Sequence, residues 1–213
     1  MSEFHLHCFP ESGGCYKAAL MLALCGAPWS AEWVDYFKGE TRTPEWRQRV
    51  SVMGEVPVLE HAGRRLTQSG VILTHLSRHF GRFGGDGEET LRWLLFDNHK
   101  FTSYLATWRF LLGWAEAPDP AVAAFFRARV EGAFAVVEAQ LADRPFLLGE
   151  APTVADISMQ GYLHYPLEEW PLDHARFPRV MGWRERFAAM AGYAPAYALL
   201  PGARTPGRLF GLT

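Results

Sequence analysis

Two residues with reactive functional groups, Ser12 and Cys15, lie three positions apart in the segment CFPESGGCYKAAL, residues 8–20. Ser12 supplies a hydroxyl and Cys15 supplies a thiol, in the spacing of a Cys-x-x-Cys redox turn whose first cysteine is replaced by serine. An apolar run, FHLHCF, precedes them, and a helix-like run follows. A helix N-terminus carries free N–H groups and partial positive charge. We therefore expect this turn to favour an anion.

Two chemistries use such an anion, and the residues of the turn leave both open. In one, Cys15 has a lowered pKa and reacts as a thiolate. In the other, Ser12 donates a hydrogen bond to a thiolate that belongs to a bound substrate. Because position 12 holds serine, an intramolecular dithiol is excluded. The G-x-S-x-G surroundings of a serine nucleophile are also missing around Ser12.

The first third of the chain alternates strand-like and helix-like segments that would hold this turn. In order they are FHLHCF, CYKAALMLALCG, AEWVDYF, TPEWRQRV, PVLEH, RLTQ and SGVILTHLSRHF. The segments PVLEH and RLTQ flank a turn at Ala62-Gly63-Arg64, which is typical of a hairpin. The order β-α-β-α-β-β-α predicts a small mixed sheet covered by helices.

Strand signals end at the glycine-rich, acidic stretch GRFGGDGEE. Helical segments separated by prolines then follow: ETLRWLLFDNHKFTSYLATWRFLLGW, PAVAAFFRARVEGAFAVVEAQLA, TVADISMQGYLHY and RVMGWRERFAAMA. The change of composition predicts a mixed α/β domain over residues 1–81 and an all-helical domain over residues 88–213.

Composition limits the class of protein. The chain has 213 residues, 49% of them hydrophobic, and a formal net charge of -2, which suits a folded globular protein. It has no Lys/Arg run interleaved with aromatic residues, so we expect no nucleic-acid partner. The longest apolar run, AALMLALCGAPW, is too short to span a bilayer, so we expect no membrane partner.

Cysteine usage and the start of the chain indicate a cytoplasmic location. Three cysteines, an odd number, suit a reducing compartment, and MSEFHLHCF is not typical of a secretory signal. No His, Cys, Asp or Glu residues have metal-ligand spacing along the sequence, so we expect no metal.

Four local features, in this order and spacing, resemble the cytosolic glutathione transferases, and the resemblance covers essentially the whole chain. They are Ser12-Gly13-Gly14-Cys15-Tyr16-Lys17, Gly54-Glu55-Val56-Pro57, Gln68-Ser69 and Thr153-Val154-Ala155-Asp156. The first resembles the Ser-Gly-x-Cys-Tyr-Lys turn of bacterial members. The resemblance implies the family fold, a thioredoxin-like βαβαββα domain followed by an all-α domain, with glutathione as co-substrate and a homodimeric assembly.

The resemblance also implies roles for single residues. It makes Ser12 the catalytic residue that stabilises the sulfur of glutathione. Pro57 would follow a cis bond that leaves the backbone of Val56 free to pair with glutathione as an added strand. Gln68 and Ser69 would hold the γ-glutamyl carboxylate at a helix N-terminus. Alternatively, Ser69 only caps that helix.

Further residues complete the implied glutathione site. Glu55 stands beside the expected position of the glycine carboxylate of glutathione and would repel it unless Lys38 or Arg42 compensates. Asn98 is the candidate to reach the glutathione of a partner subunit across the dimer interface. By contrast, we interpret Thr153 and Asp156 as a structural capping box.

The second substrate would bind between the first turn and the helix LRWLLFDNHKFTSYLATWRFL. Tyr104, Trp108 and Arg109 lie about one turn apart on this helix, and Phe9 and Phe210 would close the pocket. An aromatic-walled pocket suits a small hydrophobic electrophile. Alternatively, Tyr104 and Trp108 are core residues.

These features predict a glutathione transferase that conjugates the thiolate of glutathione, stabilised by Ser12, to a hydrophobic electrophile. Two alternatives stay open. The first is a non-catalytic protein of the same fold that binds glutathione or another ligand. The second is a thiol transferase or reductase that uses Cys15, although a cysteine in the first turn of a helix also packs well as a small hydrophobic residue.

Overall fold

The computed structural model describes residues 2–205 and residue 207. Its first part contains the elements β1 (Phe4–Cys8), α1 (Gly13–Leu24), β2 (Trp29–Trp33), α2 (Pro44–Arg49), β3 (Val58–His61), β4 (Arg64–Thr67) and α3 (Ser69–Phe80). A short 3-10 turn, Glu40–Arg42, precedes α2. The sheet has four strands in the order β2-β1-β3-β4, with β1 parallel to β2 and the other pairs antiparallel. The predicted thioredoxin-like βαβαββα order is confirmed.

The second part is helical. It contains α4 (Gly87–Phe96), a π-helical turn (Asp97–Phe101), α5 (Thr102–Gly113), α6 (Pro120–Gln140), α7 (Val154–Met159), α8 (Pro178–Ala188) and α9 (Ala196–Leu199), with 3-10 turns at Leu167–Glu169 and His174–Arg176. The one long helix predicted from residue 89 is therefore α4 and α5 joined by the π-helical turn. Residues 81–86 connect α3 to α4, at the predicted boundary between domains.

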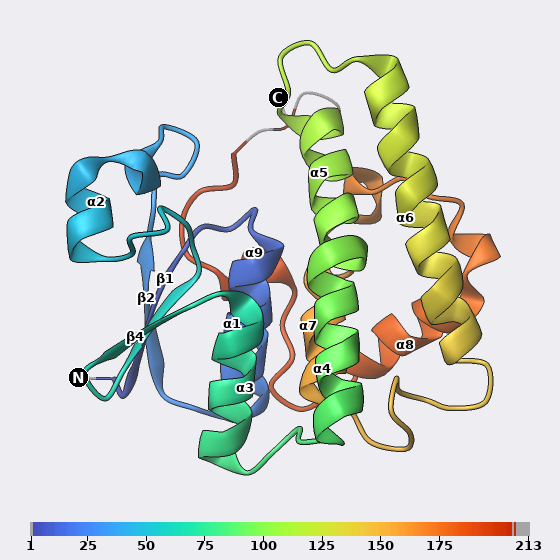
Figure 1. Cartoon of the computed structure of the whole chain (residues 1–213), viewed down its shortest axis with the longest axis horizontal. Helices are drawn as coiled ribbons and strands as arrows, with labels where there is room; N and C mark the ends of the chain where they lie inside the picture. The colour runs from blue at the N-terminus through green and yellow to red at the C-terminus, as the bar shows by residue number, and fades with distance from the viewer. Residues whose placement is uncertain (1, 206, 208–213) are drawn as a thin grey trace.

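Figure 1 shows how the two parts meet. The sheet lies at one side, and α1 and α3 separate it from the long α4–α5 column and from α6. Helix α2 covers the opposite face of the sheet, where Trp46 packs with Val34 and Val58. Among the residues described, no helix has the length and apolar character needed to cross a membrane.

The alternation of side chains along β1 explains how the sheet is covered. Phe4, Leu6 and Cys8 are fully buried in the main core, whereas His5 and His7 lie on the other face of the strand. The β3–β4 hairpin turns through Ala62 and Gly63, whose φ angles of 49° and 74° are both left-handed. Arg64 already belongs to β4, so the turn is shorter than the sequence suggested.

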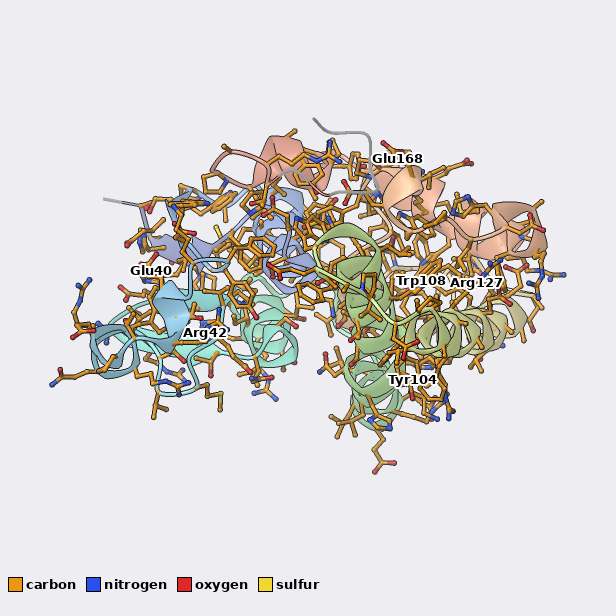
Figure 2. The ribbon with its side chains drawn as sticks, turned by 90° about the horizontal axis from the view of Figure 1, so that it is seen from above. Glu40, Arg42, Tyr104, Trp108, Arg127 and Glu168 are labelled. Carbon is orange, nitrogen blue, oxygen red and sulfur yellow. The ribbon has the colours of Figure 1, made fainter. Side chains whose placement is uncertain are left out.

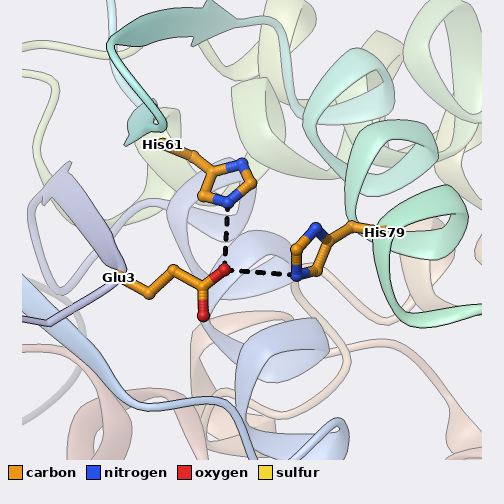
Figure 3. A group of neighbouring side chains, drawn as sticks. All are labelled: Glu3, His61 and His79. Carbon is orange, nitrogen blue, oxygen red and sulfur yellow. Dashed lines mark hydrogen bonds and ion pairs between the residues drawn. The ribbon is translucent and has the colours of Figure 1, made fainter.

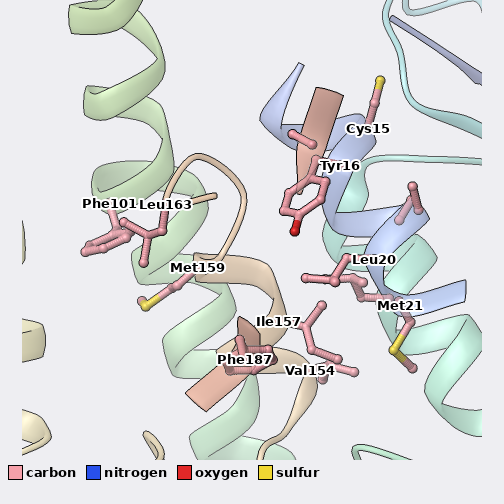
Figure 4. Packing of buried hydrophobic residues seen from close by; sticks show 14 of the residues in the cluster. Cys15, Tyr16, Leu20, Met21, Phe101, Val154, Ile157, Met159, Leu163 and Phe187 are labelled. Carbon is pink, nitrogen blue, oxygen red and sulfur yellow. The ribbon is translucent and has the colours of Figure 1, made fainter. Parts of the chain in front are cut away.

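Helix α1 is buried on nearly all sides because it lies between the sheet and the helical part. Its residues Tyr16, Leu20 and Met21 belong to the same core cluster as Val154 and Ile157 of α7 (Figure 4). A single continuous core thus joins the two parts and fixes the turn before α1 relative to α5.

The predicted capping box at the start of α7 is confirmed. The backbone N–H of Thr153 donates to Asp156 Oδ2 at 2.8 Å, and the Thr153 side chain accepts from the backbone N–H of residue 156. Asp156 is fully buried and also accepts from the N–H of Leu147 at 2.7 Å and from Trp183 Nε1 at 3.2 Å. This carboxylate therefore organises the helical part of the fold.

Candidate functional site

Ser12 lies between β1 and α1 and is the N-cap of α1. Its extended backbone, with φ -85° and ψ 109°, turns the chain into the helix, and its Oγ accepts a hydrogen bond from the N–H of Cys15 at 3.1 Å. The oxygen accepts in this contact, which does not use the hydroxyl hydrogen. Ser12 is 8% exposed, which makes its hydroxyl a nearly buried donor at a helix N-terminus.

A cavity of about 350 Å³ opens beside Ser12. It is lined from both parts of the chain by Phe9, Glu11, Ser12, Tyr36, Phe37, Glu55, Val56, Ala106, Thr107, Arg109, Phe110, Trp114 and Tyr162. The aromatic wall is ordered, since the ring of Phe9 stacks on Tyr36 with centroids 4.6 Å apart and Phe37 stacks on Trp114 at 5.8 Å. The cavity therefore combines the Ser12 hydroxyl at a helix N-terminus with a largely aromatic lining.

Of the five predicted electrophile residues, the structure brings Phe9 and Arg109 to this cavity. Tyr104 and Trp108 lie elsewhere: Tyr104 packs against Phe126 of α6, and Trp108 is a core residue with 3% exposure. Figure 2 shows both on the side of α5 that faces α6. Neither residue lines this cavity, because a helix has about 3.6 residues per turn and α5 presents Ala106 and Phe110 to the cavity instead. Phe210 lies outside the described residues.

Arg109 does not offer a free positive charge to the cavity. It is 2% exposed, and its Nε donates to Glu169 Oε2 at 2.8 Å. Its other nitrogens donate to the carbonyl of Glu11 at 2.8 Å and to the hydroxyl of Tyr197 at 2.9 Å. The buried carboxylate of Glu169 pairs with Arg109 and also with Arg204, and these contacts hold Arg109 as a part of the cavity wall that joins α5 to the first turn.

Glu11, next to Ser12, is a second ionisable group of the cavity. Burial raises the pKa of its carboxyl, and the backbone N–H of Thr205 donates to its Oε1. The carbonyl of Thr205 in turn accepts from Trp114 Nε1 at 3.3 Å. The segment that ends at Thr205 is thereby attached to two cavity residues.

Two of the predicted glutathione-binding residues, Glu55 and Val56, line the sheet side of the cavity. The Val56–Pro57 peptide bond is cis, as expected. Gln68 has a positive φ of 65°, occupies the N-cap of α3, and donates from Nε2 to Glu55 Oε2 at 3.0 Å. Ser69 is the first residue of α3, so the alternative in which Ser69 is the cap is wrong.

Two other predicted residues have different surroundings from those expected. Lys38 is 86% exposed on its side chain and pairs with Asp35 at 3.0 Å rather than with Glu55. Asn98 is exposed and lies beside the first turn of α3 in its own chain, since a Cβ added to Gly70 would be 3.3 Å from Asn98 Nδ2. It lines a second cavity with Gln68 and Gly70.

Cys15 is fully buried and is not among the residues that line the cavity. Figure 4 shows it in the first turn of α1. Burial raises the pKa of its thiol to about 12, although hydrogen bonding by Ser12 acts in the opposite direction. At neutral pH this thiol is protonated and withdrawn from any substrate in the cavity.

Several residues of the cavity could not be located by sequence reasoning. Tyr36, Phe37, Trp114 and Tyr162 come from loops whose paths depend on the packing of the two parts. The sequence does contain one related feature, the glycine at position 13. A Cβ at this position would lie 2.6 Å from the ring of Tyr162, so a larger residue would clash with it. The glycine allows this ring to lie directly against the first turn of α1.

Comparisons with known proteins point to one family. The chain matches the profiles described as "Glutathione S-transferase, N-terminal domain" over residues 12–79 and "Glutathione S-transferase, C-terminal domain" over residues 103–190. Glutathione S-transferase theta-2 of Mus musculus is 28% identical over 181 residues, which cover 78% of this chain and 73% of that protein.

Solved structures give the same result. A glutathione S-transferase from Xanthobacter autotrophicus Py2 is 30% identical with a TM-score of 0.82, covering 91% of this chain and 96% of that chain. A glutathione transferase homolog from Lodderomyces elongisporus, solved with two GSH per subunit, is 19% identical with a TM-score of 0.85, covering 94% of this chain and 100% of that chain. The second likeness concerns the fold alone.

Proposed function

Because this chain belongs to the cytosolic glutathione transferase family, we propose that it conjugates glutathione, as co-substrate, to a small hydrophobic electrophile. In this proposal Ser12 donates a hydrogen bond to the glutathione thiolate. The thiolate attacks an electrophilic carbon and a sulfur–carbon bond forms. The displaced electron pair leaves with the leaving group or, in an addition, takes up a proton.

The observation that carries the proposal is the position of Ser12. Its hydroxyl stands at the N-terminus of α1, nearly buried, at the edge of an aromatic cavity. Lowering a thiol pKa from about 8.5 to about 6.5 requires about 2.7 kcal/mol of preferential stabilisation of the thiolate. A hydrogen bond to a charged group contributes about 1.5–3 kcal/mol, and a helix N-terminus adds about 0.3–1 kcal/mol. The two together are sufficient.

Glutathione is proposed to lie along the sheet side of the cavity. Val56 would pair with its backbone, and Gln68 and Ser69 would hold its γ-glutamyl end at the first turn of α3. Glu55 already accepts from Gln68 and would lie near the glycine carboxylate. A homolog of the same fold was solved with GSH, which supports glutathione as the ligand.

The electrophile is proposed to occupy the aromatic part of the cavity. Phe9 and Tyr36 form one wall from the first part of the chain, and Phe110 and Trp114 form the other from the end of α5. A cavity of about 350 Å³ with these walls suits a compact, largely apolar molecule. Arg109 contributes position rather than free charge.

We also propose a homodimer formed through α3 and α4. Val71, Leu91 and Leu95 are exposed apolar side chains on these two helices, at 53%, 54% and 60% exposure. They border the second cavity together with Asn98, which would thereby lie close to a partner subunit. Analytical ultracentrifugation of the full chain and of a Leu95→Glu variant tests this assembly.

No observation favours a reaction at Cys15, because its thiol is buried and protonated at neutral pH. Cys8 and Cys15 are buried and Cys25 is partly buried, and none forms a disulfide. Free thiols support the proposed cytoplasmic setting.

Calorimetric titration tests the proposal with two ligands, glutathione and S-methylglutathione. Only glutathione has a thiol that can ionise. A hydrogen-bond donor to the thiolate therefore strengthens the binding of glutathione and not that of S-methylglutathione. Ser12→Ala should weaken glutathione binding several-fold more than S-methylglutathione binding, and Ser12→Thr, which keeps the hydroxyl, should restore the difference. Equal losses for both ligands would contradict the role of Ser12, and binding without any conjugation would favour the non-catalytic alternative.

A further inference from the structure

A group of three side chains converges at the end of the sheet that is remote from Ser12. Glu3 precedes β1, His61 ends β3, and His79 lies in the last turn of α3. Figure 3 shows both imidazole rings directed at the carboxylate of Glu3. Since β1 separates this group from Ser12 and a strand rises about 3.3 Å per residue, the two places are roughly 15 Å or more apart. The group is independent of the proposed conjugation.

We propose that Glu3, His61 and His79 bind a divalent transition metal ion of the zinc type. Two imidazole nitrogens and one carboxylate oxygen are a common protein ligand set for Zn²⁺, with a water molecule as the fourth ligand. The three residues are far apart in the sequence, which is why ligand spacing along the chain predicted no metal.

The distances suit a tetrahedral ion. Nε2 of His61 lies 3.2 Å from Glu3 Oε1, and Nε2 of His79 lies 3.3 Å from the same oxygen. Ligand atoms about 2.0–2.1 Å from a tetrahedral Zn²⁺ are about 3.3–3.4 Å from each other. All three ligand atoms lie within 4.8 Å of one another. A small rotation of the half-exposed His79 ring would bring its Nε2 to tetrahedral distance from the other two ligand atoms.

A third histidine, His75, supports His61 as a ligand. Nδ1 of His61 lies 2.9 Å from Nε2 of His75. If Nε2 of His75 accepts a hydrogen bond from Nδ1–H of His61, then Nε2 of His61 is the unprotonated ring nitrogen, available to a metal ion beside Glu3. Metal-binding histidines commonly have such a partner on their second nitrogen.

Packing holds the His61 ring in place, whereas the more exposed His79 ring can adjust. His61 is 9% exposed and stacks on Phe4 with ring centroids 4.4 Å apart, whereas the rings of His61 and His79 are 4.8 Å apart at 81°. A bound ion would therefore link the start of β1, the β3–β4 hairpin and the end of α3. Its expected effect is stabilisation of the sheet part rather than catalysis.

A second group, His5, His7 and Glu32, lies on the other face of the sheet and is the natural competitor for the ion. There the distances from the ring nitrogens to Glu32 Oε2 are 3.3 and 3.6 Å. Nε2 of His7 already faces Glu60 at 3.3 Å. Each group contains one buried histidine, and the first group has the more regular distances, 3.2 and 3.3 Å, so we assign the ion to it.

Titration of the full chain with Zn²⁺ and Co²⁺ tests the proposal, with a C-terminal purification tag removed and with glutathione omitted because its thiol binds metals. We expect one Zn²⁺ per chain, visible absorption bands of tetrahedral Co²⁺, and a rise in Tm. Glu3→Gln and His79→Gln should abolish the Co²⁺ bands and the Tm rise. His75→Ala should weaken Zn²⁺ binding roughly 10- to 100-fold.

The exposed His99, remote from the sheet, provides the matched control, and His99→Gln should bind Zn²⁺ as the unaltered chain does. Absence of Zn²⁺ binding in the unaltered chain overturns the proposal. Unchanged Zn²⁺ affinity in folded Glu3→Gln and His79→Gln also overturns it, as does loss of the ion in His5→Ala with retention in His79→Gln.

Discussion

The ammonium nitrogen of Lys17 lies 2.6 Å from Oδ2 of Asp97, and both side chains are almost completely buried. Lys17 belongs to α1 and Asp97 begins the π-helical turn between α4 and α5, so the pair crosses from the sheet part to the helical part. Ser158 Oγ also donates to Asp97 Oδ2, and the backbone N–H of Thr102 donates to Asp97 Oδ1. The buried carboxylate is therefore well satisfied by hydrogen bonds.

Removal of one member of this pair should destabilise the fold strongly. Lys17→Met leaves the Asp97 carboxylate buried without its counter-charge, at a cost of about 3–5 kcal/mol. The double variant Lys17→Met/Asp97→Leu removes both charges and should be less destabilised than the single variant. Urea unfolding measures both, with Lys100→Met at an exposed position as the control. A single variant that loses less than about 1 kcal/mol would contradict this role.

Substitution of Glu55 should strengthen glutathione binding. Glu55→Gln removes a negative charge beside the proposed glycine carboxylate, while its amide oxygen can still accept from Gln68 Nε2. Affinity should rise about two- to fivefold at low ionic strength and less at high salt, because salt screens exposed charges. Calorimetry at two salt concentrations tests this, with Glu185→Gln as a remote control. Equal or weaker binding would indicate that the Glu55–Gln68 contact matters more than the charge.

Substitutions of Phe110 and Tyr104 should show which face of α5 contacts the electrophile. Phe110 lines the observed cavity, whereas Tyr104 lies on the face expected from the sequence. Phe110→Ala should lower kcat/KM for an aromatic electrophile by about five- to thirtyfold, since about 1–2 kcal/mol of apolar contact is lost. The KM for glutathione should stay the same. Tyr104→Leu, on the α6 face, should leave both kinetic constants unchanged. The reverse pattern, with a loss in Tyr104→Leu alone, would place the electrophile elsewhere.

Thiol reactivity should follow burial. Burial raises the pKa of Cys15 to about 12 and raises that of Cys8 further, so both thiols stay protonated at pH 7.5. In the native protein Ellman's reagent should modify Cys25 alone, with a rate that increases as pH rises toward its own raised pKa. All three thiols should react in denaturant. Rapid native reaction in a Cys25→Ser variant would show that Cys15 or Cys8 is accessible.

Local sequence signals predicted most of the fold. The capping box at Thr153 and the hairpin turn at Ala62–Gly63 depend on residues within a few positions of each other, and the structure contains both. Ser12 was likewise located at the turn into α1 from its immediate neighbours. Such features are encoded by backbone preferences and short-range hydrogen bonds, which a sequence displays directly.

Features that depend on distant partners were not predictable. Asp97 stands in a polar stretch that resembles a solvated helix face, yet its partner is Lys17, 80 positions away. Trp108 and Phe110 are both aromatic, and only the packing of α5 against α6 decides which of them faces the cavity. The convergence of His61 and His79 on Glu3 depends in the same way on the sheet register.

The ionisation of bound glutathione tests the central proposal most directly. Thiolate absorbance of the complex, titrated from pH 5 to 9 in the unaltered chain, Ser12→Thr and Ser12→Ala, gives the pKa of the bound thiol in each. Because Ser12→Ala also removes the helix cap, each complex is first checked for folding and saturation with glutathione. We predict a bound-thiol pKa near 6.5 with serine or threonine, and a pKa about one to two units higher with alanine. The same pKa in all three complexes would contradict the proposal that Ser12 stabilises the thiolate.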